Sequence, residues 1–197
     1  MVTIGILALQ GDFEKHEQKI KALGQNSILV RTSEHLSQCD GLIIPGGEST
    51  TLTKLLKKHA LWDDIIDFAE LKPVYGTCAG CILVAESIVE MDQDSLKLLN
   101  IAVQRNAYGR QVDSFIDDIK IQLNGKAGTM EGVFIRAPKI KSIGEHVTPL
   151  AWHGQHIILA EQGRILAGTF HPELTDDVRI HDYFVEKIKM NRSGSEG

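Results

Sequence analysis

Cysteine is scarce in this sequence, which has 3 cysteines among 197 residues. They are Cys39, Cys78 and Cys81, and this odd number does not suit a framework of disulfide bonds. A chain of this length can build one sizeable hydrophobic core without disulfides or structural metal ions. We therefore expect reduced thiols, and any cysteine chemistry should be local.

Long apolar runs and an excess of basic residues are also lacking. No apolar run approaches the roughly 20 residues that a membrane-spanning helix needs, and the first residues lack the basic region of a signal peptide. The net charge is −5, with 21 Lys and Arg scattered among 26 Asp and Glu. We therefore expect a cytoplasmic protein that has neither nucleic acid nor membrane as a partner.

The first half of the chain alternates between apolar runs and amphipathic segments. Residues 2–9, 27–30 and 41–45 are rich in Ile and Val, which is typical of parallel strands that are covered on both faces. Residues 12–23 carry apolar side chains among charged ones and end before Gly24, a favourable residue after a helix. The order predicted for this half is β-α-β-β-α-β-α.

Two further helices, at 49–59 and 61–70, precede the fourth strand of this order. The second half holds short β-rich runs between polar turns, which predict antiparallel strands, and a final helix at 176–190. The fold class is therefore α/β, with a three-layer, open, mainly parallel sheet that is flanked by helices and extended by antiparallel strands. We expect one domain over residues 1–190 and a mobile tail at 191–197.

Residues 73–86, PVYGTCAGCILVAE, combine a short strand, a glycine-containing turn and a helix. The turn at Cys78 fits a nucleophile elbow, in which a tight strand-to-helix connection exposes a reactive side chain. Cys78 and Cys81 also form a C-x-x-C spacing, which occurs in redox and metal sites. This stretch alone leaves both chemistries open.

A histidine after the last predicted strand can serve Cys78 as a base. Cysteine acts as a nucleophile in its thiolate form, which needs a nearby base or a helix N-terminus. His171 should lie at the carboxyl end of the sheet, as the elbow does. Pro172 favours an extended His171, so that Glu173 can reach the imidazole. Cys78, His171 and Glu173 therefore predict a triad of nucleophile, base and orienting acid.

The triad chemistry also needs hydrogen-bond donors for an oxyanion. Residues 43–50, IIPGGEST, end a strand in two glycines and open a helix, so that backbone N–H groups can approach a substrate oxygen closely. We expect the donors to be the N–H groups of Gly47 and Ala79. A glycine-rich turn before a helix can also bind phosphate, but neither of the common phosphate-binding glycine motifs is present.

The motifs PGGES, GTCAG and FHPEL, in this order and over nearly the whole chain, resemble the class I (triad) glutamine amidotransferases. Within that family, IGILALQGD at the start and the segments 104–115 and 132–138 are similar to the glutaminase subunits of pyridoxal 5'-phosphate synthases. The resemblance implies hydrolysis of L-glutamine through a cysteinyl thioester. It also implies that ammonia passes to a (β/α)8-barrel synthase subunit, in a large hetero-oligomer.

The same resemblance implies which residues contact glutamine, and it implies neither a metal nor a cofactor. The implied contacts are Gly47, Glu48, Ser49, Arg105, Ile135 and Arg136. Simpler roles are open for some of them. Both arginines can be surface charges, and Glu48 and Ser49 can serve only to start a helix, where such residues are favoured.

One departure from the family concerns the C-x-x-C spacing. The family usually has an aliphatic residue where this chain has Cys81, and a buried free cysteine behaves as a small hydrophobic residue. We therefore interpret the spacing as a coincidence. His16, His153 and His181 have no triad-like context and are interpreted as structural or surface groups, and Cys39 is interpreted as an ordinary thiol.

Gln10, at the carboxyl end of the first strand, can cap a loop or take part in the site. Because the Gly46–Gly47 peptide can face the wrong way in the isolated subunit, we expect docking of the barrel near Gln10 to orient it. Two other functions stay open at this point. One is a related Cys-His hydrolase of another amide or peptide, and the other is a binding module that has no catalytic role.

Overall fold

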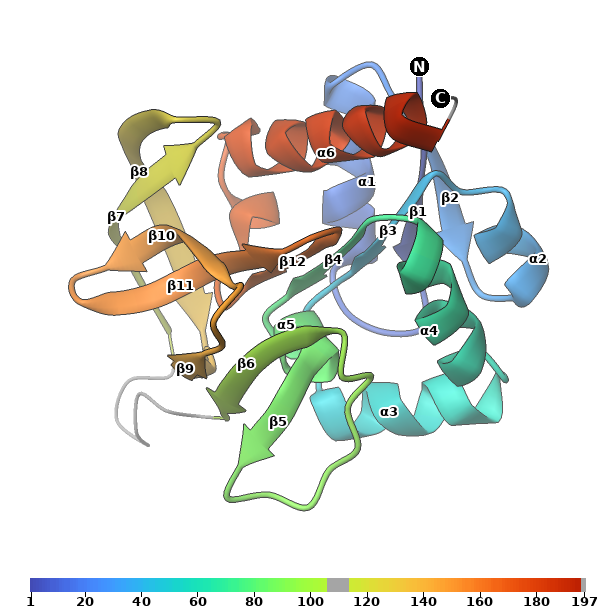
Figure 1. The fold of residues 1–197 in the computed structure, drawn as a ribbon, viewed down its shortest axis with the longest axis horizontal. Helices are drawn as coiled ribbons and strands as arrows, with labels where there is room; N and C mark the ends of the chain where they lie inside the picture. Colours follow the sequence, from blue (N-terminus) through green and yellow to red (C-terminus); the bar gives the residue numbers. More distant parts are fainter. Residues whose placement is uncertain (106–113, 196–197) are drawn as a thin grey trace.

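A computed structural model describes residues 1–105 and 114–195 of the chain. Over these residues it forms a nine-stranded sheet in the order β2-β1-β3-β4-β12-β11-β10-β7-β8 (Figure 1). The parallel part consists of β2 (Asn26–Val30), β1 (Thr3–Leu7), β3 (Gly41–Ile44), β4 (Val74–Thr77) and β12 (Ile165–Gly168). The antiparallel part consists of β11 (His156–Gln162), β10 (Thr148–His153), β7 (Ser114–Leu123) and β8 (Lys126–Ile135). The predicted fold class is confirmed.

Helices cover both faces of the parallel part. They are α1 (Phe13–Ala22), α2 (Ser33–Ser37), α3 (Ser49–Lys58), α4 (Trp62–Leu71), α5 (Ala79–Val84) and α6 (Arg179–Ser195). Helices α1 and α6 pack on one face with one hydrophobic cluster, and α3, α4 and α5 pack on the other face with a second (Figure 1). Burial on both faces explains why the parallel strands are continuous apolar runs in the sequence.

A small second sheet flanks α5. It consists of β5 (Ala85–Val89), β6 (Leu99–Gln104) and β9 (Lys139–Ile143). Strand β5 begins directly where α5 ends, and its last residue pairs with Gln104 of β6. The second sheet therefore brings the neighbouring Arg105 toward the nucleophile turn.

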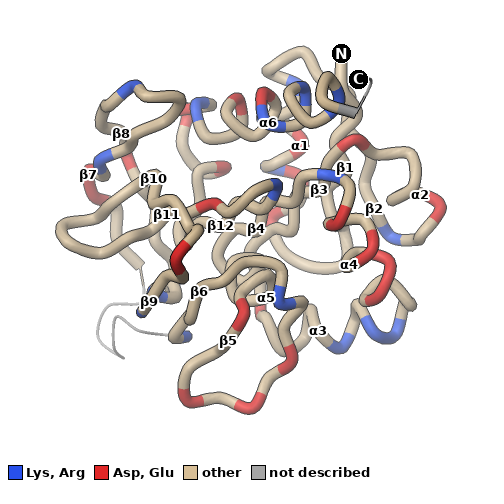
Figure 2. Tube along the Cα trace, viewed as in Figure 1, with Lys and Arg blue, Asp and Glu red and all other residues tan. Residues whose placement is uncertain are grey.

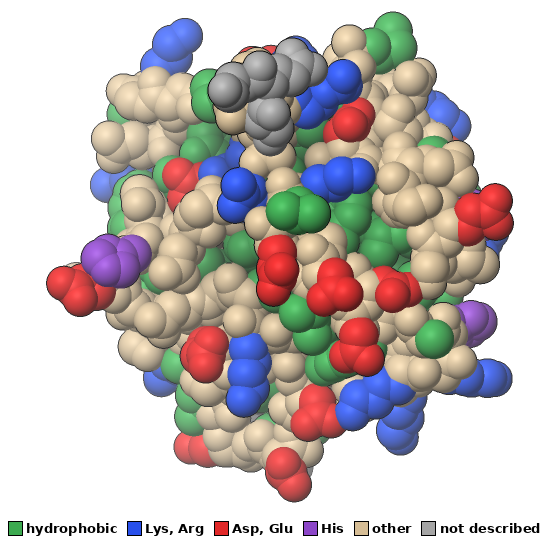
Figure 3. Space-filling model, turned by 45° about the vertical axis from the view of Figure 1, so that its right-hand side comes forward, with side chains coloured by type: hydrophobic (Ala, Val, Ile, Leu, Met, Phe, Trp, Pro, Cys, Tyr) green, Lys and Arg blue, Asp and Glu red, His purple; other side chains and the backbone are tan. Residues whose placement is uncertain are grey.

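Charges of opposite sign lie on neighbouring helices. Helix α3 carries only basic charges, Lys54, Lys57 and Lys58, whereas α4 carries only acidic ones (Figure 2). The two helices contact each other, and acidic and basic side chains are mixed on the face in Figure 3. None of the helices in the described part of the chain is long and apolar enough to cross a membrane.

Three sequence-based expectations were wrong. The predicted order lacked α2, a five-residue helix that begins at the Thr32 cap and connects β2 to β3. The last helix begins at Arg179 rather than at residue 176, because the preceding residues form the 3₁₀ turn η1 (Pro172–Leu174) and Asp177 accepts a hydrogen bond from the Arg179 N–H (2.9 Å).

The end of this helix is the third error, since α6 continues through residues 191–195 instead of ending at residue 190. Asn191 explains part of this extension, because its side chain donates to the Leu71 carbonyl (2.9 Å) and accepts from Arg164 (2.6 Å). Residues 196 and 197 lie outside the described residues. Most of the family-like segment 104–115 also lies outside them.

Glycines allow α5 to pack directly on β3 and β4. A Cβ atom at Gly80 would lie 2.0 Å from the Ile44 carbonyl oxygen, and one at Gly76 would lie 2.4 Å from the Gly80 carbonyl oxygen. Both distances are far below van der Waals contact, and the obstacles are backbone atoms. No larger residue can therefore keep this geometry.

We predict that Gly80→Ala lowers the free energy of unfolding by about 1–3 kcal/mol or more, because the added methyl group must displace the Ile44 backbone. Urea denaturation measures this effect. Gly194→Ala is the control, since a methyl group at this helical position meets nothing within 4 Å. Equal stabilities of the two variants would contradict the packing argument.

Candidate active site

A pocket of about 230 Å³ opens at the carboxyl ends of β3, β4 and β12. The predicted residues that line it are Gly47, Glu48, Ser49, Cys78, Ala79, Arg105, Ile135, Arg136 and His171. Asp12 and Ile82, which were not predicted, line it as well. Glu173 lies behind His171, and Gln10 lies at the edge of the site. The structure thus brings together the residues that the sequence marked separately.

Cys78 occupies the turn between β4 and α5. Its φ is +50°, a conformation that is strained for a residue with a side chain and is typical of a nucleophile elbow. The Cys78 N–H donates to the Gly168 carbonyl (2.8 Å), which fixes the turn to the end of β12. The Sγ atom lies 3.9 Å from the Ile135 carbonyl oxygen. The side chain is 7% exposed, and it reaches solvent only through the pocket.

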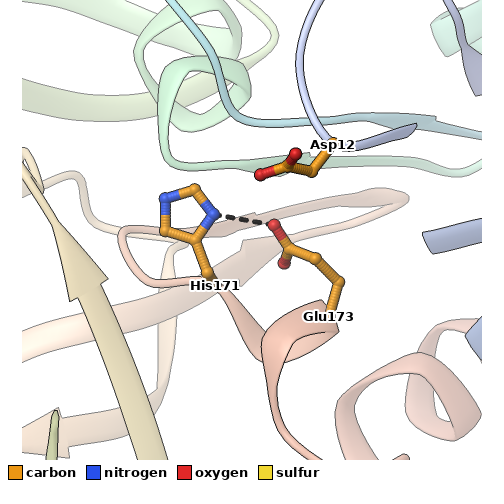
Figure 4. Close-up of side chains that lie close together, drawn as sticks. All are labelled: Asp12, His171 and Glu173. Carbon is orange, nitrogen blue, oxygen red and sulfur yellow. Dashed lines mark hydrogen bonds and ion pairs between the residues drawn. The ribbon is translucent and has the colours of Figure 1, made fainter. Parts of the chain in front are cut away.

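His171 and Glu173 form a short, buried hydrogen bond. The His171 Nδ1 atom lies 2.7 Å from Glu173 Oε1 (Figure 4), and the two side chains are 6% and 0% exposed. We had expected an extended segment after His171. The bond forms although this segment is a 3₁₀ turn. Glu173 belongs to η1 instead, and the tight turn after Pro172 directs its carboxylate back toward the ring.

The surroundings of this pair keep both groups charged. Burial opposes the charge on His171, but the neighbouring Cys78 and the hydrogen bond with Glu173 raise its pKa to about 10. Burial also opposes the charge on Glu173, but His16 and His171 lower its pKa to about 2. The site can therefore hold an imidazolium beside the Glu173 carboxylate.

The predicted oxyanion donors lie on two separate turns. Gly47 has a φ of +148°, which favours glycine. A Cβ atom on Gly11 would lie 1.7 Å from the Gly46 carbonyl oxygen, so that glycine at position 11 is required for this orientation of the Gly46–Gly47 peptide. The Gln10 side-chain oxygen accepts from the Glu48 N–H (3.4 Å). The loop after β1 therefore contacts the turn that carries Gly47.

Glu48 both begins α3 and binds Arg105. Its carboxylate accepts from the N–H groups of Thr50 (3.1 Å) and Thr51 (2.7 Å), and Arg105 Nη2 lies 2.9 Å from Glu48 Oε1. Partial burial opposes ionisation of Glu48, but the hydrogen bonds from Thr50 and Thr51 lower its pKa to about 2. Glu48 therefore both caps the start of α3 and lines the pocket.

Gln93 joins this cluster, although no local pattern in the sequence marked it. Its side-chain oxygen accepts from the Ser49 hydroxyl (3.0 Å) and from Arg105 Nη1 (3.3 Å). Ser49 is 1% exposed, so Gln93 satisfies a buried hydroxyl and also orients the Arg105 guanidinium. Arg136 has a φ of +42° and is exposed at the other side of the pocket.

Two histidines that we had interpreted as structural or surface groups are fully buried behind the triad. His16 Nε2 lies 3.4 Å from Glu173 Oε2, and His16 Nδ1 lies 2.9 Å from His181 Nε2. A signal for His16 was present in the sequence, since Phe13, His16 and Ile20 follow helical spacing on the buried face of α1. His153 instead pairs with Asp117 away from the pocket (2.9 Å).

The structure does not support a joint role for Cys78 and Cys81. Cys81 is fully buried in the hydrophobic cluster beneath α5, and burial raises the pKa of its thiol. Burial also raises the pKa of Cys39, to about 11. All three cysteines are free thiols. Cys81 therefore behaves as a small core residue.

Asp12, His171 and Glu173 have possible metal-ligand atoms within 4.8 Å of one another (Figure 4). However, His171 Nδ1 and Glu173 Oε1 are already hydrogen-bonded to each other. A metal ion would have to break this bond. The geometry therefore favours the triad over a metal site.

The chain is similar over nearly its whole length to proteins of one family. Residues 6–190 match the model of the SNO glutamine amidotransferase family. A protein named pyridoxal 5'-phosphate synthase subunit PdxT, from Oenococcus oeni, is 49% identical over 97% of this chain and 99% of its own length. The PdxT subunit of Solibacter usitatus is 46% identical over 95% of this chain and all of its own length.

A solved structure described as a glutamine amidotransferase superposes with a TM-score of 0.88. It is 45% identical, and the match covers 94% of this chain and 98% of the other. The architecture and the sequence similarity therefore agree.

We predict that a glutamine-like electrophile, such as a chloroketone analogue, labels Cys78 and spares Cys39 and Cys81. The pocket exposes only the first of these thiols, and burial holds the other two in the unreactive protonated form. Peptide mapping locates the label. A label found mainly on Cys81 would refute the elbow assignment.

Proposed function

This chain belongs to the SNO glutamine amidotransferase family, and we propose from this that it is the glutaminase subunit of a pyridoxal 5'-phosphate synthase. It hydrolyses L-glutamine to L-glutamate and ammonia, and the ammonia is used in vitamin B6 biosynthesis. The observation that carries the proposal is the pocket that places Cys78 and His171 beside the groups implied to bind glutamine.

Cys78, His171 and Glu173 act as the catalytic triad of this proposal. The Cys78 thiolate attacks the side-chain amide carbon of glutamine and forms a C–S bond. His171 donates its Nε2 proton to the amide nitrogen, the C–N bond breaks, and ammonia leaves a glutamyl thioester. His171 then takes a proton from water, and the hydroxide forms a C–O bond with the thioester carbon. The C–S bond breaks, glutamate leaves, and the Cys78 thiolate is restored. Glu173 holds the imidazole in the required tautomer and stabilises the imidazolium.

The N–H groups of Gly47 and Ala79 stabilise the developing oxyanion in each step. Such donors act strongly in a pocket with little water, because they are already oriented when the charge develops. Both residues line the pocket, Gly47 from the β3–α3 connection and Ala79 as the first residue of α5. The flexible Gly46–Gly47 peptide is the less fixed of the two donors.

The rest of the pocket recognises the amino-acid end of glutamine. Arg105, held by Glu48 and Gln93, offers a guanidinium for the α-carboxylate. Glu48 and Ser49 offer acceptors for the α-ammonium group, and the Ile135 and Arg136 segment closes the other side. An amide substrate that lacks the free α-carboxylate and α-ammonium groups cannot make either set of contacts. The pocket therefore suits free glutamine better than a peptide amide.

A synthase partner is part of the proposal, because free ammonia diffuses away unless a second enzyme receives it. We propose a (β/α)8-barrel subunit that docks on the loop after β1, in a cytoplasmic hetero-oligomer. Gln10 accepts from the Glu48 N–H, next to Gly47. Contact with this loop can therefore change the orientation of the oxyanion turn.

We predict that adding the barrel subunit raises glutamate release by the wild-type chain, measured with a coupled glutamate assay. Gln10→Ala should reduce the stimulated rate more than it reduces glutamine affinity, since it removes the contact between the two loops. Cys78→Ala should abolish hydrolysis, and Cys81→Ala is the matched control that should retain it. Full activity of the isolated chain, unchanged by saturating partner, would refute the dependence on docking.

We predict that Arg105→Gln raises KM for glutamine about ten- to a hundredfold and leaves kcat nearly unchanged, because one charge-assisted hydrogen bond is worth about 1.5–3 kcal/mol. Steady-state kinetics with the partner present measures both constants. Arg136→Gln serves as a comparison at the exposed side of the pocket. An unchanged KM for glutamine in both variants would show that the two arginines do not bind the substrate and are ordinary surface charges.

A further inference from the structure

The triad carboxylate has a second oxygen that the catalytic roles do not use. Glu173 Oε1 receives the hydrogen bond from His171, whereas Oε2 is fully buried and makes no close hydrogen bond among the described residues. The nearest ring nitrogen behind it is His16 Nε2, at 3.4 Å. A buried carboxylate oxygen without a donor is costly, so the protonation state of His16 matters to the triad.

The geometry selects one tautomer of His16. If Nδ1 carried the proton, the lone pair of Nε2 would face the Glu173 carboxylate, which is repulsive. If Nε2 carries the proton, it lies on the side of the ring that faces Oε2 and the Thr77 hydroxyl, and Nδ1 is free to accept a hydrogen bond. His181 Nε2 lies 2.9 Å from His16 Nδ1 and can supply that bond.

Thr77 fits the same arrangement. Its hydroxyl oxygen lies 3.2 Å from His16 Nε2 and can share the N–H with the carboxylate. Thr77 is the last residue of β4 and precedes Cys78 in the chain. The histidine therefore contacts both the acid of the triad and the strand that carries the nucleophile.

We propose that His16 is a positioning residue of the glutaminase, which donates from Nε2 to Glu173 Oε2, and that His181 fixes the tautomer of His16 by donating to its Nδ1. This inference rests on the proposed function. The two histidines extend the triad inward, from Cys78 through His171 and Glu173 to α1 and α6. Their task is to keep the carboxylate ionised and correctly turned, so that it stabilises the His171 imidazolium.

Both histidines act as neutral rings. Burial lowers the pKa of His16, and burial together with His16 lowers the pKa of His181 to about 3. The contact of His16 with Glu173 is therefore a hydrogen bond from a neutral imidazole rather than an ion pair.

Other titratable groups face this network from the surrounding elements. Asp12 faces His16 and His171 from the loop before α1, Cys78 faces His171 from the β4–α5 turn, and Tyr75 faces His181 and Glu173 from β4. Lys19 of α1 faces His181 and donates to the Thr175 carbonyl. These groups stay in place when His16 is changed, so that a shift in pH dependence can be assigned to the lost donor.

The first test is the pH profile of kcat/KM for glutamine with the synthase subunit present. The acid form of His171 is needed, and its raised pKa keeps activity until the pH rises through about 10. His16→Phe keeps a ring but removes the donor, so that the carboxylate is no longer held in the orientation that stabilises the imidazolium. We expect the upper limb of the profile to move at least one unit to lower pH, and kcat at pH 8 to fall about tenfold, with KM nearly unchanged.

Three further variants separate positioning from packing. His16→Gln keeps an N–H donor near Glu173 and should restore most of the lost activity and the upper limb. His181→Phe removes the donor to His16 and should give an intermediate shift. Ile20→Ala, on the same buried face of α1, should lower stability and leave the profile unchanged. An unmoved upper limb in a folded His16→Phe would overturn the proposal.

The second test does not depend on activity or on the folding of a variant. Nitrogen-15 NMR of the wild-type chain reports which ring nitrogens carry protons. We expect His16 to be protonated on Nε2 only and His181 to carry a proton on Nε2. A proton on Nδ1 of His16 would overturn the proposal, whereas wild-type chain that fails to hydrolyse glutamine would overturn the proposed function instead.

Discussion

The close backbone packing of the Cys78 turn is the constraint on which the rest of the site depends. Gly80 rests against the Ile44 carbonyl, and Gly76 rests against Gly80, so that α5 lies directly on the ends of β3 and β4. This packing holds Cys78 at a positive φ and directs its side chain into the pocket. The strain at Cys78 is compensated by a fully buried helix, in which every residue from Ala79 to Val84 contributes to the core.

Electrostatic organisation follows from the same burial. A carboxylate and an imidazole are buried together beside Cys78, so the charges of His171 and Glu173 stabilise each other more strongly than they would at the surface. Glu173 stays ionised in this setting because His16 and His171 lie close to its carboxylate on two sides. The buried side of the His171–Glu173 pair is therefore as much a part of the proposed site as the pocket that is proposed to bind glutamine.

Local patterns in the sequence were enough to predict the parallel core and to mark most of the residues that line the pocket. Continuous Ile and Val runs indicated strands that are covered on both faces, and the glycines around Cys78 and Gly47 indicated the two turns at the ends of such strands. Because those ends meet at one edge of the sheet, residues more than 90 positions apart, such as Cys78 and His171, could be expected to lie together.

Other features depended on tertiary contacts that no local pattern contains. Asn191 keeps α6 helical beyond the expected end through bonds to two distant residues, and Gln93 joins the Arg105 cluster from a loop with no regular pattern. The hydrogen bond of His16 with His181 links residues 165 positions apart. The sequence could place His16 on a buried helix face, but only the fold shows that Glu173 lies opposite it.

The central claim is that Cys78 carries the glutamyl group during hydrolysis. Rapid acid quenching of the complex during turnover of isotope-labelled glutamine, followed by peptide mass mapping, tests it most directly. We expect one labelled glutamyl group on the peptide that contains Cys78, and its loss as the glutamine is consumed. Steady hydrolysis with no label on this peptide, or with the label on another residue, would contradict the account.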